Sequence, residues 1–267
     1  MKESTTFNSQ EQVNRFLALT VDVEQSYAPS LSVFEESIQN RLTVFLANQW
    51  KATCFVEGAI AKQIPGLLRL LADAGHEVGS HGFCHQDQRS LSPNELLRDL
   101  DLALDLFAEE GVQCAGYRAP FFLRHPDLEQ ILLSRSIPYD SSKPRIWFPG
   151  RYDNRRLPPQ PFTPASGLLH VPVGAVRPWL PLSVEHHKAL GFLFPKRATP
   201  DLQVMYVHSY SFGSGFKKPY FNRTYNLERT LRSMTALSGG ASLGTVGELL
   251  KRIGISHSEQ LSAAQIA

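Results

Sequence analysis

Apolar residues along this chain alternate between short continuous runs and stretches in which they recur at helical spacing. The continuous runs predict buried strands at 16–21, 52–56, 76–80, 112–117, 137–140, 168–171 and 203–207. The helically spaced stretches predict helices at 34–50, 64–75, 92–111, 127–135, 184–190 and 245–253. Because strands and helices alternate, the pattern predicts a parallel sheet with helices on its outside.

Two local motifs mark where helices begin. In Ser92-Pro93-Asn94-Glu95, the serine can cap the N3 amide and the glutamate can reach back to the serine, while proline suits the first helical position. Thr245 and Glu248 have the same spacing near the end of the chain. Both motifs predict a capping box.

Composition limits the domain organisation and the class of partner. With 267 residues, 42% apolar and 19% charged, the chain is the size of one α/β barrel, and we expect a single domain over 1–255 with a mobile tail at 256–267. Between 143 and 199 the pattern gives way to Pro, Gly and aromatic residues, which predicts long loops. The net charge of +2 is too small to favour a nucleic-acid partner.

The N-terminal segment is polar and lacks the apolar core of a signal peptide, and no apolar run has the length of a membrane span. We therefore expect a soluble, cytoplasmic protein without stable membrane insertion. Cys54, Cys84 and Cys114 are odd in number and have no zinc or redox spacing, so we expect reduced thiols. Cys84 lies between His81 and His85 and could be a metal ligand, but a buried apolar thiol is the favoured interpretation.

Ionisable residues follow the predicted strands at five places. They are Asp22 with Glu24, His81 with His85, Arg118, Asp140 and His208. In a parallel barrel such positions converge at the C-terminal face. The spacing of His81 and His85 puts both imidazoles on one face of a helical turn, where they can bind one ion.

In order and local context these segments resemble the polysaccharide deacetylase family, also called the NodB-homology or carbohydrate esterase 4 family. The matching segments are Thr20-Val-Asp22-Val-Glu24, Ala52-Thr-Cys-Phe-Val-Glu-Gly58, His81-Gly-Phe-Cys-His85, Arg118-Ala-Pro120-Phe121, Tyr139-Asp140-Ser141 and His208. The resemblance spans about residues 16 to 250 and implies a distorted (β/α) barrel. It also implies removal of an N-acetyl group from an amino sugar.

The first motif departs from the commonest family form, which has two adjacent acids. Here Val23 follows Asp22 and cannot bind metal, so the resemblance implies that Glu24 is the ligand. An acid, a spacer and a second acid occur in some branches. With Val21-Asp22-Val23-Glu24, the chain most resembles the branch of deacetylases from bacterial exopolysaccharide clusters.

The resemblance implies a divalent ion held by Glu24, His81 and His85. Zinc is the expected ion, and iron, cobalt and manganese suit the same mixed nitrogen and oxygen donors. Asp22 would be the general base and His208 the general acid.

Three further residues have implied supporting roles. Arg118 would pair with Asp22 and orient it, Asp140 would pair with His208 and favour the imidazolium, and the backbone amide of Phe121 would help to bind the oxyanion.

Each of these residues also has a structural interpretation. Asp22 with Arg118 can be a structural ion pair, Asp140 can belong to a turn, and His208 can be a core histidine. The other histidines are expected in surface or structural roles, with His170 the nearest to the cleft.

The loop region adds two further open interpretations. Trp147 and Trp179 can stack on a sugar or simply pack. Arg145, Arg151, Arg155 and Arg156 can hold an anionic group such as a phosphate or form a solvated loop.

The sequence therefore predicts a metal-dependent deacetylase of an N-acetylated amino sugar. A cytoplasmic location would favour a precursor, or a lipid-linked or nucleotide-linked sugar. One alternative is hydrolysis of another non-peptide C–N bond by an allantoinase-like or deformylase-like enzyme. Another is a catalytically inactive carbohydrate-binding relative. The sequence leaves the oligomeric state open.

Overall fold

The structure is a computed structural model that describes residues 15–24, 30–190, 202–212 and 227–255. Its strands are β1 (Phe16–Val23), β2 (Thr53–Val56), β3 (Glu77–Ser80), β4 (Tyr139–Asp140), β5 (Trp147–Phe148), β6 (Tyr152–Asp153), β7 (Leu169–His170), β8 (Ala175–Arg177), β9 (Leu180–Pro181), β10 (Leu202–His208) and β11 (Ser242–Gly244).

Its α-helices are α1 (Leu31–Ala47), α2 (Gly58–Gln63), α3 (Leu67–Asp73), α4 (Pro93–Glu109), α5 (Leu128–Ser134), α6 (Val184–Leu190), α7 (Leu227–Leu237) and α8 (Val246–Arg252). Short 3₁₀ turns are η1 (Gln88–Ser90), η2 (Pro120–Phe122) and η4 (Ser209–Phe212).

Parallel strands form a closed but irregular barrel. The main sheet has the order β10-β1-β2-β3, with β11 beside the start of β1. From β3 the ring continues through single bridges from Ser80 to Tyr117 and from Tyr117 to Asp140, then through the β4–β7 pair. A bridge from Val173 to Val204 returns to β10. Because all of these pairings are parallel, the carboxyl ends of the strands meet on one face.

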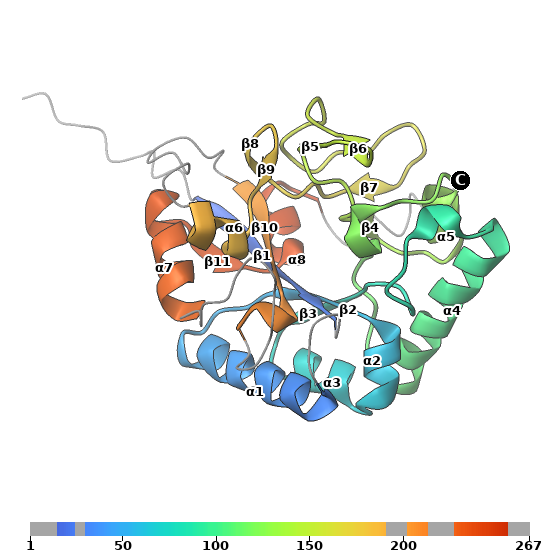
Figure 1. The fold of residues 1–267 in the computed structure, drawn as a ribbon, viewed down its shortest axis with the longest axis horizontal. Helices are drawn as coiled ribbons and strands as arrows, with labels where there is room; N and C mark the ends of the chain where they lie inside the picture. Colours follow the sequence, from blue (N-terminus) through green and yellow to red (C-terminus); the bar gives the residue numbers. More distant parts are fainter. Residues whose placement is uncertain (1–14, 25–29, 191–201, 213–226, 256–267) are drawn as a thin grey trace, which may run out of the picture.

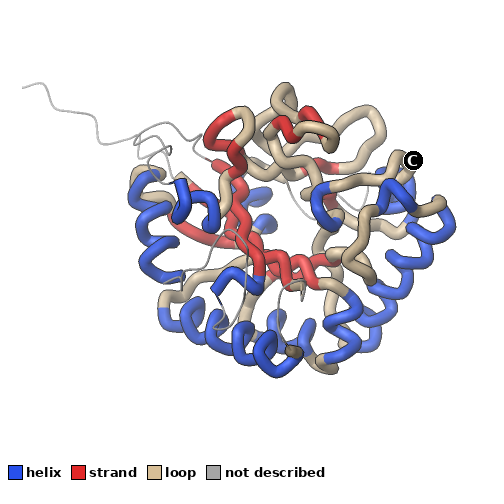
Figure 2. Tube along the Cα trace, viewed as in Figure 1, coloured by secondary structure: helices blue, strands red, loops and turns tan. Residues whose placement is uncertain are grey.

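Helices flank the barrel on the left, lower and right sides of Figure 1 and Figure 2, and short strands and loops lie at the top. Every residue of β1 is buried, which explains its continuous apolar run. The apolar stripe of α1, with Phe34, Ile38, Leu42 and Phe45, is buried in the main core. Outer helices therefore fix the strands whose ends carry the ionisable residues.

Both predicted capping boxes are confirmed. The Ser92 hydroxyl accepts from the Glu95 amide at the start of α4, and the Glu95 carboxylate accepts from the Ser92 amide at 2.7 Å. Thr245 and Glu248 make the same reciprocal pair at the start of α8. The predicted helix at 184–190 is also present as α6.

Two predicted elements were wrong in detail. The expected helix at 64–75 begins only at Leu67 and ends at Asp73, because Pro65 disfavours the helical conformation at Ile64 and Gly66 then adopts a φ of 87°. The expected strand at 112–117 is irregular and forms bridges only at Tyr117. A side chain at Gly116 would meet the Tyr139 ring, so the wall is closely packed there.

The sequence analysis missed the two small hairpins, β5–β6 and β8–β9, and also α7, although Leu227, Leu231 and Met234 recur there at helical spacing. Both hairpins lie in the predicted loop region, and Figure 1 shows them together above the barrel. They consist of strands of two or three residues, too short for an alternating pattern.

Three other expectations concern the termini, the membrane and the thiols. The tail at 256–267 lies outside the described residues, and the single domain over 1–255 stays a prediction. Among the described helices, none has both the length and the apolar character needed to cross a membrane. Cys54, Cys84 and Cys114 are free thiols. The expectation that Cys84 is buried was wrong: it is exposed in the loop after His81.

Candidate active site

A cavity of about 240 Å³ lies where the carboxyl ends of the barrel strands meet. Asp22, Glu24, His81, His85 and His208 all line it, although they come from distant parts of the sequence. The other lining residues are Ala119, Phe121, Phe122, Ile146, Phe148, Arg151, Tyr152, Trp179, Pro181, His186, Tyr206 and Tyr210.

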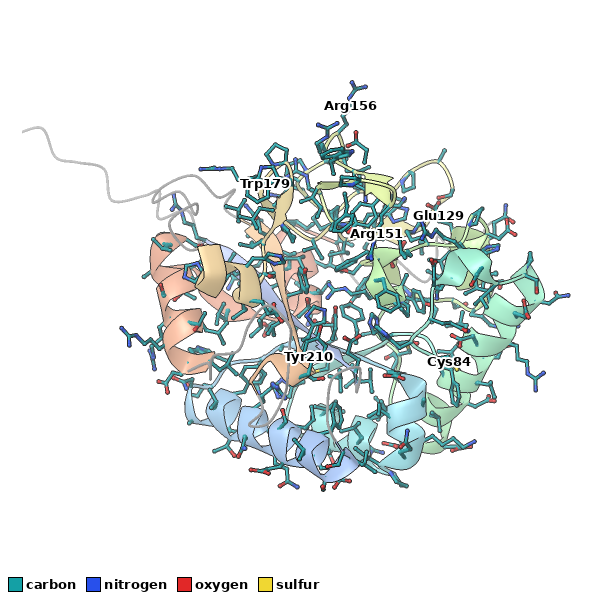
Figure 3. The ribbon with its side chains drawn as sticks, in the orientation of Figure 1. Cys84, Glu129, Arg151, Arg156, Trp179 and Tyr210 are labelled. Carbon is teal, nitrogen blue, oxygen red and sulfur yellow. The ribbon has the colours of Figure 1, made fainter. Side chains whose placement is uncertain are left out.

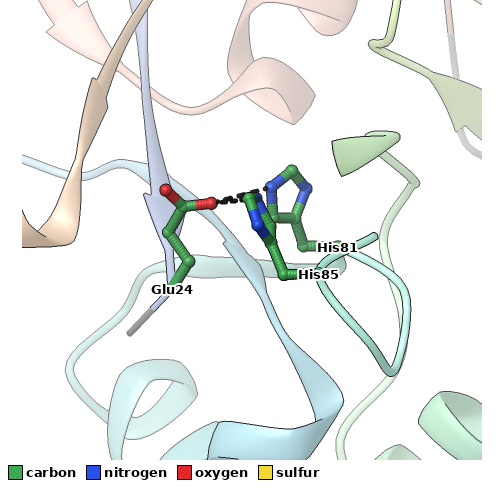
Figure 4. A group of neighbouring side chains, drawn as sticks. All are labelled: Glu24, His81 and His85. Atoms are coloured by element: carbon green, nitrogen blue, oxygen red, sulfur yellow. Dashed lines mark ion pairs between the residues drawn. The ribbon is translucent and has the colours of Figure 1, made fainter. Parts of the chain in front are cut away.

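Glu24, His81 and His85 converge in this cavity (Figure 4). One potential donor atom from each lies within 4.8 Å of the other two. The Glu24 carboxylate contacts the Nε2 atoms of both histidines, at 3.5 Å for His81. Two imidazole nitrogens and a carboxylate oxygen make a donor set that fits a divalent ion with open positions.

Surrounding groups orient the His81 side chain and hold the backbone of Glu24. The Nδ1 atom of His81 lies 2.7 Å from the Arg118 carbonyl oxygen, a contact that directs Nε2 toward Glu24. The Glu24 amide donates to the Ser209 hydroxyl at 3.0 Å, and that hydroxyl donates to the Glu24 carbonyl. Burial raises the pKa of Glu24, but its hydrogen bonds with His81 and His85 outweigh burial and lower that pKa well below its usual range.

Asp22 is held by Arg118. An Nη1 atom of Arg118 donates to Asp22 Oδ1 at 2.6 Å and to the Thr20 hydroxyl at 2.8 Å. The other guanidinium nitrogens donate to the hydroxyl and carbonyl of Ser141. Arg118 is fully buried and its guanidinium lies 4.3 Å from the centre of the Phe55 ring, so the position of Asp22 is closely fixed.

His208 pairs with Glu185 of α6. The Glu185 carboxylate lies 3.0 Å from His208 Nδ1 and accepts from the His208 amide at 2.8 Å. Burial lowers the pKa of His208, but the charge and hydrogen bond of Glu185 outweigh burial and raise that pKa. The His208 ring also stacks on Tyr210, with 4.8 Å between centroids.

Comparisons with known proteins bear on the family and the fold of the chain. Residues 9–133 match the family model described as polysaccharide deacetylase. The peptidoglycan deacetylase of Helicobacter pylori is 30% identical over 112 residues, which are 40% of this chain and 37% of that protein. Residues 9–133 thus carry the sequence pattern of the polysaccharide deacetylase family. The alignment spans little more than a third of the Helicobacter pylori relative.

Solved structures show the family's distorted (β/α) barrel. A family 4 acetyl xylan esterase from Clostridium thermocellum, in complex with a cobalt ion, superposes with a TM-score of 0.55 at 17% identity. The match covers 94% of this chain and 96% of the esterase. A pseudoenzyme of the same esterase family from Bacillus anthracis gives 0.54 at 16% identity, over 89% of this chain and 66% of that one. The expected fold class is confirmed.

The pairing of Asp140 with His208, implied by the resemblance, was wrong. Asp140 is fully buried outside the cavity lining, where it accepts from Arg124 Nε at 2.9 Å and from the Ser142 amide at 2.8 Å. Burial raises the pKa of Asp140, and Arg124 with His170 lowers it to a net value well below its usual range. Asp140 belongs to β4 and His208 to β10, and β7 with the segment around Val173 separates these two strands in the barrel. The carboxylate that contacts His208 is therefore that of Glu185.

Asp140 instead supports the segment that leads to Phe121. The Ser142 hydroxyl accepts from the Ala119 amide at 2.7 Å, and Asp140 fixes the amide of the same serine. Phe121 lies two residues further on, lines the cavity and has a φ of 56°. Its ring contacts His85, with 4.3 Å between centroids.

Two other histidines differ from expectation. His170 is fully buried beside Glu129 and Asp140 and does not line the cavity, whereas His186 does. Sequence reasoning also missed Glu185 and Ser209. Ser209 could have been found from the sequence, because it directly follows the motif residue His208. Glu185 lies 23 residues before His208, and no local motif marks it as a partner of that histidine.

We predict that Glu185→Gln moves the alkaline limb of the pH–rate profile to lower pH. Glu185 raises the pKa of His208, so removing its charge lowers that pKa, and an acid catalyst then loses its proton at lower pH. The measurement is kcat against pH for both proteins.

Asp140→Asn is the control, because Asp140 does not contact His208. It is expected to leave the position of the alkaline limb unchanged. A shift in Asp140→Asn and none in Glu185→Gln would contradict the assignment of Glu185.

Proposed function

We propose that this chain is a metal-dependent hydrolase that removes the N-acetyl group from an amino sugar or its precursor. One observation carries the proposal: a single cavity is lined by the cluster of Glu24, His81 and His85 and also by Asp22 and His208. The peptidoglycan deacetylase among the relatives supports the substrate class.

Glu24, His81 and His85 would hold the ion, for which we propose zinc. A divalent ion bound there supplies a Lewis acid that polarises the acyl carbonyl and acidifies the attacking water. The donor set also suits iron, cobalt and manganese.

Asp22 would act as the general base. Its Oδ1 is held by Arg118, and the carboxylate lines the cavity, where it can take a proton from the attacking water. The water oxygen then bonds to the acyl carbon, and the negative charge moves to the carbonyl oxygen. The backbone N–H of Phe121 would donate to that oxygen.

His208 would act as the general acid. Because Glu185 occupies its Nδ1, Nε2 is the nitrogen that can give a proton to the departing amine. When the C–N bond breaks, the amine leaves with that proton and acetate remains. Glu185 favours the protonated imidazole that this step needs.

The free thiols of Cys54, Cys84 and Cys114 support a reducing, cytoplasmic location. In that compartment the substrate would be a precursor, or a lipid-linked or nucleotide-linked sugar, rather than a finished extracellular polymer.

Metal removal tests the proposed cluster. His81→Ala and His85→Ala are expected to stay folded, lose stoichiometric metal and release no acetate from acetylated amino sugars, because two of the three donors do not hold the ion. Chelator treatment of the wild type is expected to give the same loss, and added zinc is expected to restore activity. Elemental analysis and an acetate assay measure both quantities.

His186→Ala is the matched control, since His186 lines the same cavity outside the cluster. It is expected to retain metal. Stoichiometric metal in both cluster variants would rule out this site, and metal-loaded wild type without acetate release would favour the other amide hydrolases or an inactive relative.

Asp22→Asn separates the base from the ligands. The substitution preserves shape and removes the proton acceptor, so we expect full metal content with turnover reduced by about 10² to 10⁴. Metal analysis and kcat on one acetylated sugar measure the two effects.

Asp101→Asn is the control, because it makes the same change at an exposed acid that is paired with Arg135. It is expected to keep the metal content and the turnover of the wild type. An empty site in Asp22→Asn would make Asp22 a ligand. Full activity with metal present would refute the mechanism.

A further inference from the structure

Two hairpins form an aromatic wall over the cavity. Phe148 and Tyr152 come from β5–β6, and Trp179 comes from the turn of β8–β9. The Trp147 amide donates to the Pro178 carbonyl at 2.7 Å and so joins the hairpins. Phe148 and Trp179 are 43% and 51% exposed although they line a cavity, which leaves their faces open to a ligand.

Arg151 lies in the turn of the first hairpin and also lines the cavity. Its amide donates to the Phe148 carbonyl at 3.0 Å, and its guanidinium lies 4.7 Å from the centre of the Phe148 ring. Among the described lysines and arginines, Arg151 alone lines this cavity. Figure 3 shows it within the molecule, whereas Arg156 projects outward at the top.

The neighbouring charges already have other partners. Arg155 forms an ion pair with Asp153 at 2.6 Å, and Arg145 donates to the Leu157 carbonyl. Asp87, which interacts electrostatically with Arg151, is paired with Arg89 at 2.7 Å. Within the described part of the chain, no carboxylate forms a salt bridge with Arg151.

The carboxylates inside the cavity are also paired. Asp22 binds Arg118, and Glu24 contacts the two histidines of the proposed metal cluster. An uncharged acetylated sugar offers a guanidinium only neutral hydroxyl and carbonyl acceptors. An oxyanion is the stronger partner, because guanidinium nitrogens donate to phosphate or carboxylate oxygens in charge-assisted, often bidentate hydrogen bonds.

We infer that the substrate carries an oxyanion, a phosphate or a carboxylate, near the acylated amino group, and that Arg151 binds it. This inference rests on the proposed function. Phe148 holds the guanidinium plane through a cation–π contact, and Tyr152 and Trp179 flank the adjoining sugar ring. Arg151 is thus a specificity-determining residue.

The test compares three acetylated substrates on the zinc-loaded protein. They are N-acetylglucosamine, its 1-phosphate, and N-acetylmuramic acid, which carries a carboxylate. We expect wild type to favour at least one anionic substrate in kcat/KM. Arg151→Met is expected to lower the anionic-to-neutral ratio by about 10- to 100-fold, mainly through KM. Arg151→Lys is expected to restore part of the ratio.

Arg156→Met is the matched control, because it removes the same charge outside the cavity lining. It is expected to keep the wild-type ratio. Preference for the phosphate or for the carboxylate identifies the source of the oxyanion. An equal ratio in wild type and Arg151→Met, or an equal loss on all three substrates, would overturn the inference.

A binding experiment separates this inference from the proposed function. Tryptophan fluorescence, with Trp179 in the cavity wall, follows titration of each sugar into the zinc-loaded proteins. Weaker binding of the anionic sugars to Arg151→Met supports the inference even if no substrate releases acetate, in which case only the proposed function fails. Equal binding by both proteins would refute the role of Arg151.

Discussion

The site depends on one buried positive charge. Arg118 has no exposed surface, and its side chain binds Asp22, Thr20 and Ser141 while its carbonyl oxygen contacts His81. A buried guanidinium without such partners would be strongly destabilising, so the ends of four neighbouring barrel segments must keep these positions. The same constraint thus fixes the proposed base and orients one proposed metal ligand.

The proposed general acid, His208, is held in a similar way by residues of other elements. Glu185 of α6 contacts His208 and also interacts electrostatically with the buried Arg41 of α1. Burial lowers the pKa of Arg41 to about 9, and the charge of Glu185 opposes that change. In both pairs a buried charge on one element holds a titratable group on another. The cavity between them is covered by the hairpins β5–β6 and β8–β9, which supply its aromatic and cationic rim.

Sequence patterns predicted what depends on local spacing. The capping boxes at Ser92 and Thr245 and the buried run of β1 need no tertiary information. The convergence of Glu24 with His81 and His85 followed from strand ends meeting on one face. The resemblance implied the wrong ion-pair partners for Asp140 and His208, because tertiary packing decides which charged side chain lies beside each of them. Asp140 is bound by Arg124 and His208 by Glu185, and neither pair has a sequence signature. The irregular wall at 112–117 likewise depends on the Tyr139 ring packed against Gly116.

The most direct test of the central claim is anomalous diffraction at the zinc edge from zinc-loaded crystals. The account predicts one strong peak about 2.0–2.2 Å from Nε2 of His81, Nε2 of His85 and a carboxylate oxygen of Glu24. Asp22 should remain on Arg118, outside the coordination sphere. An ion coordinated by Asp22, or bound away from both histidines, would contradict it.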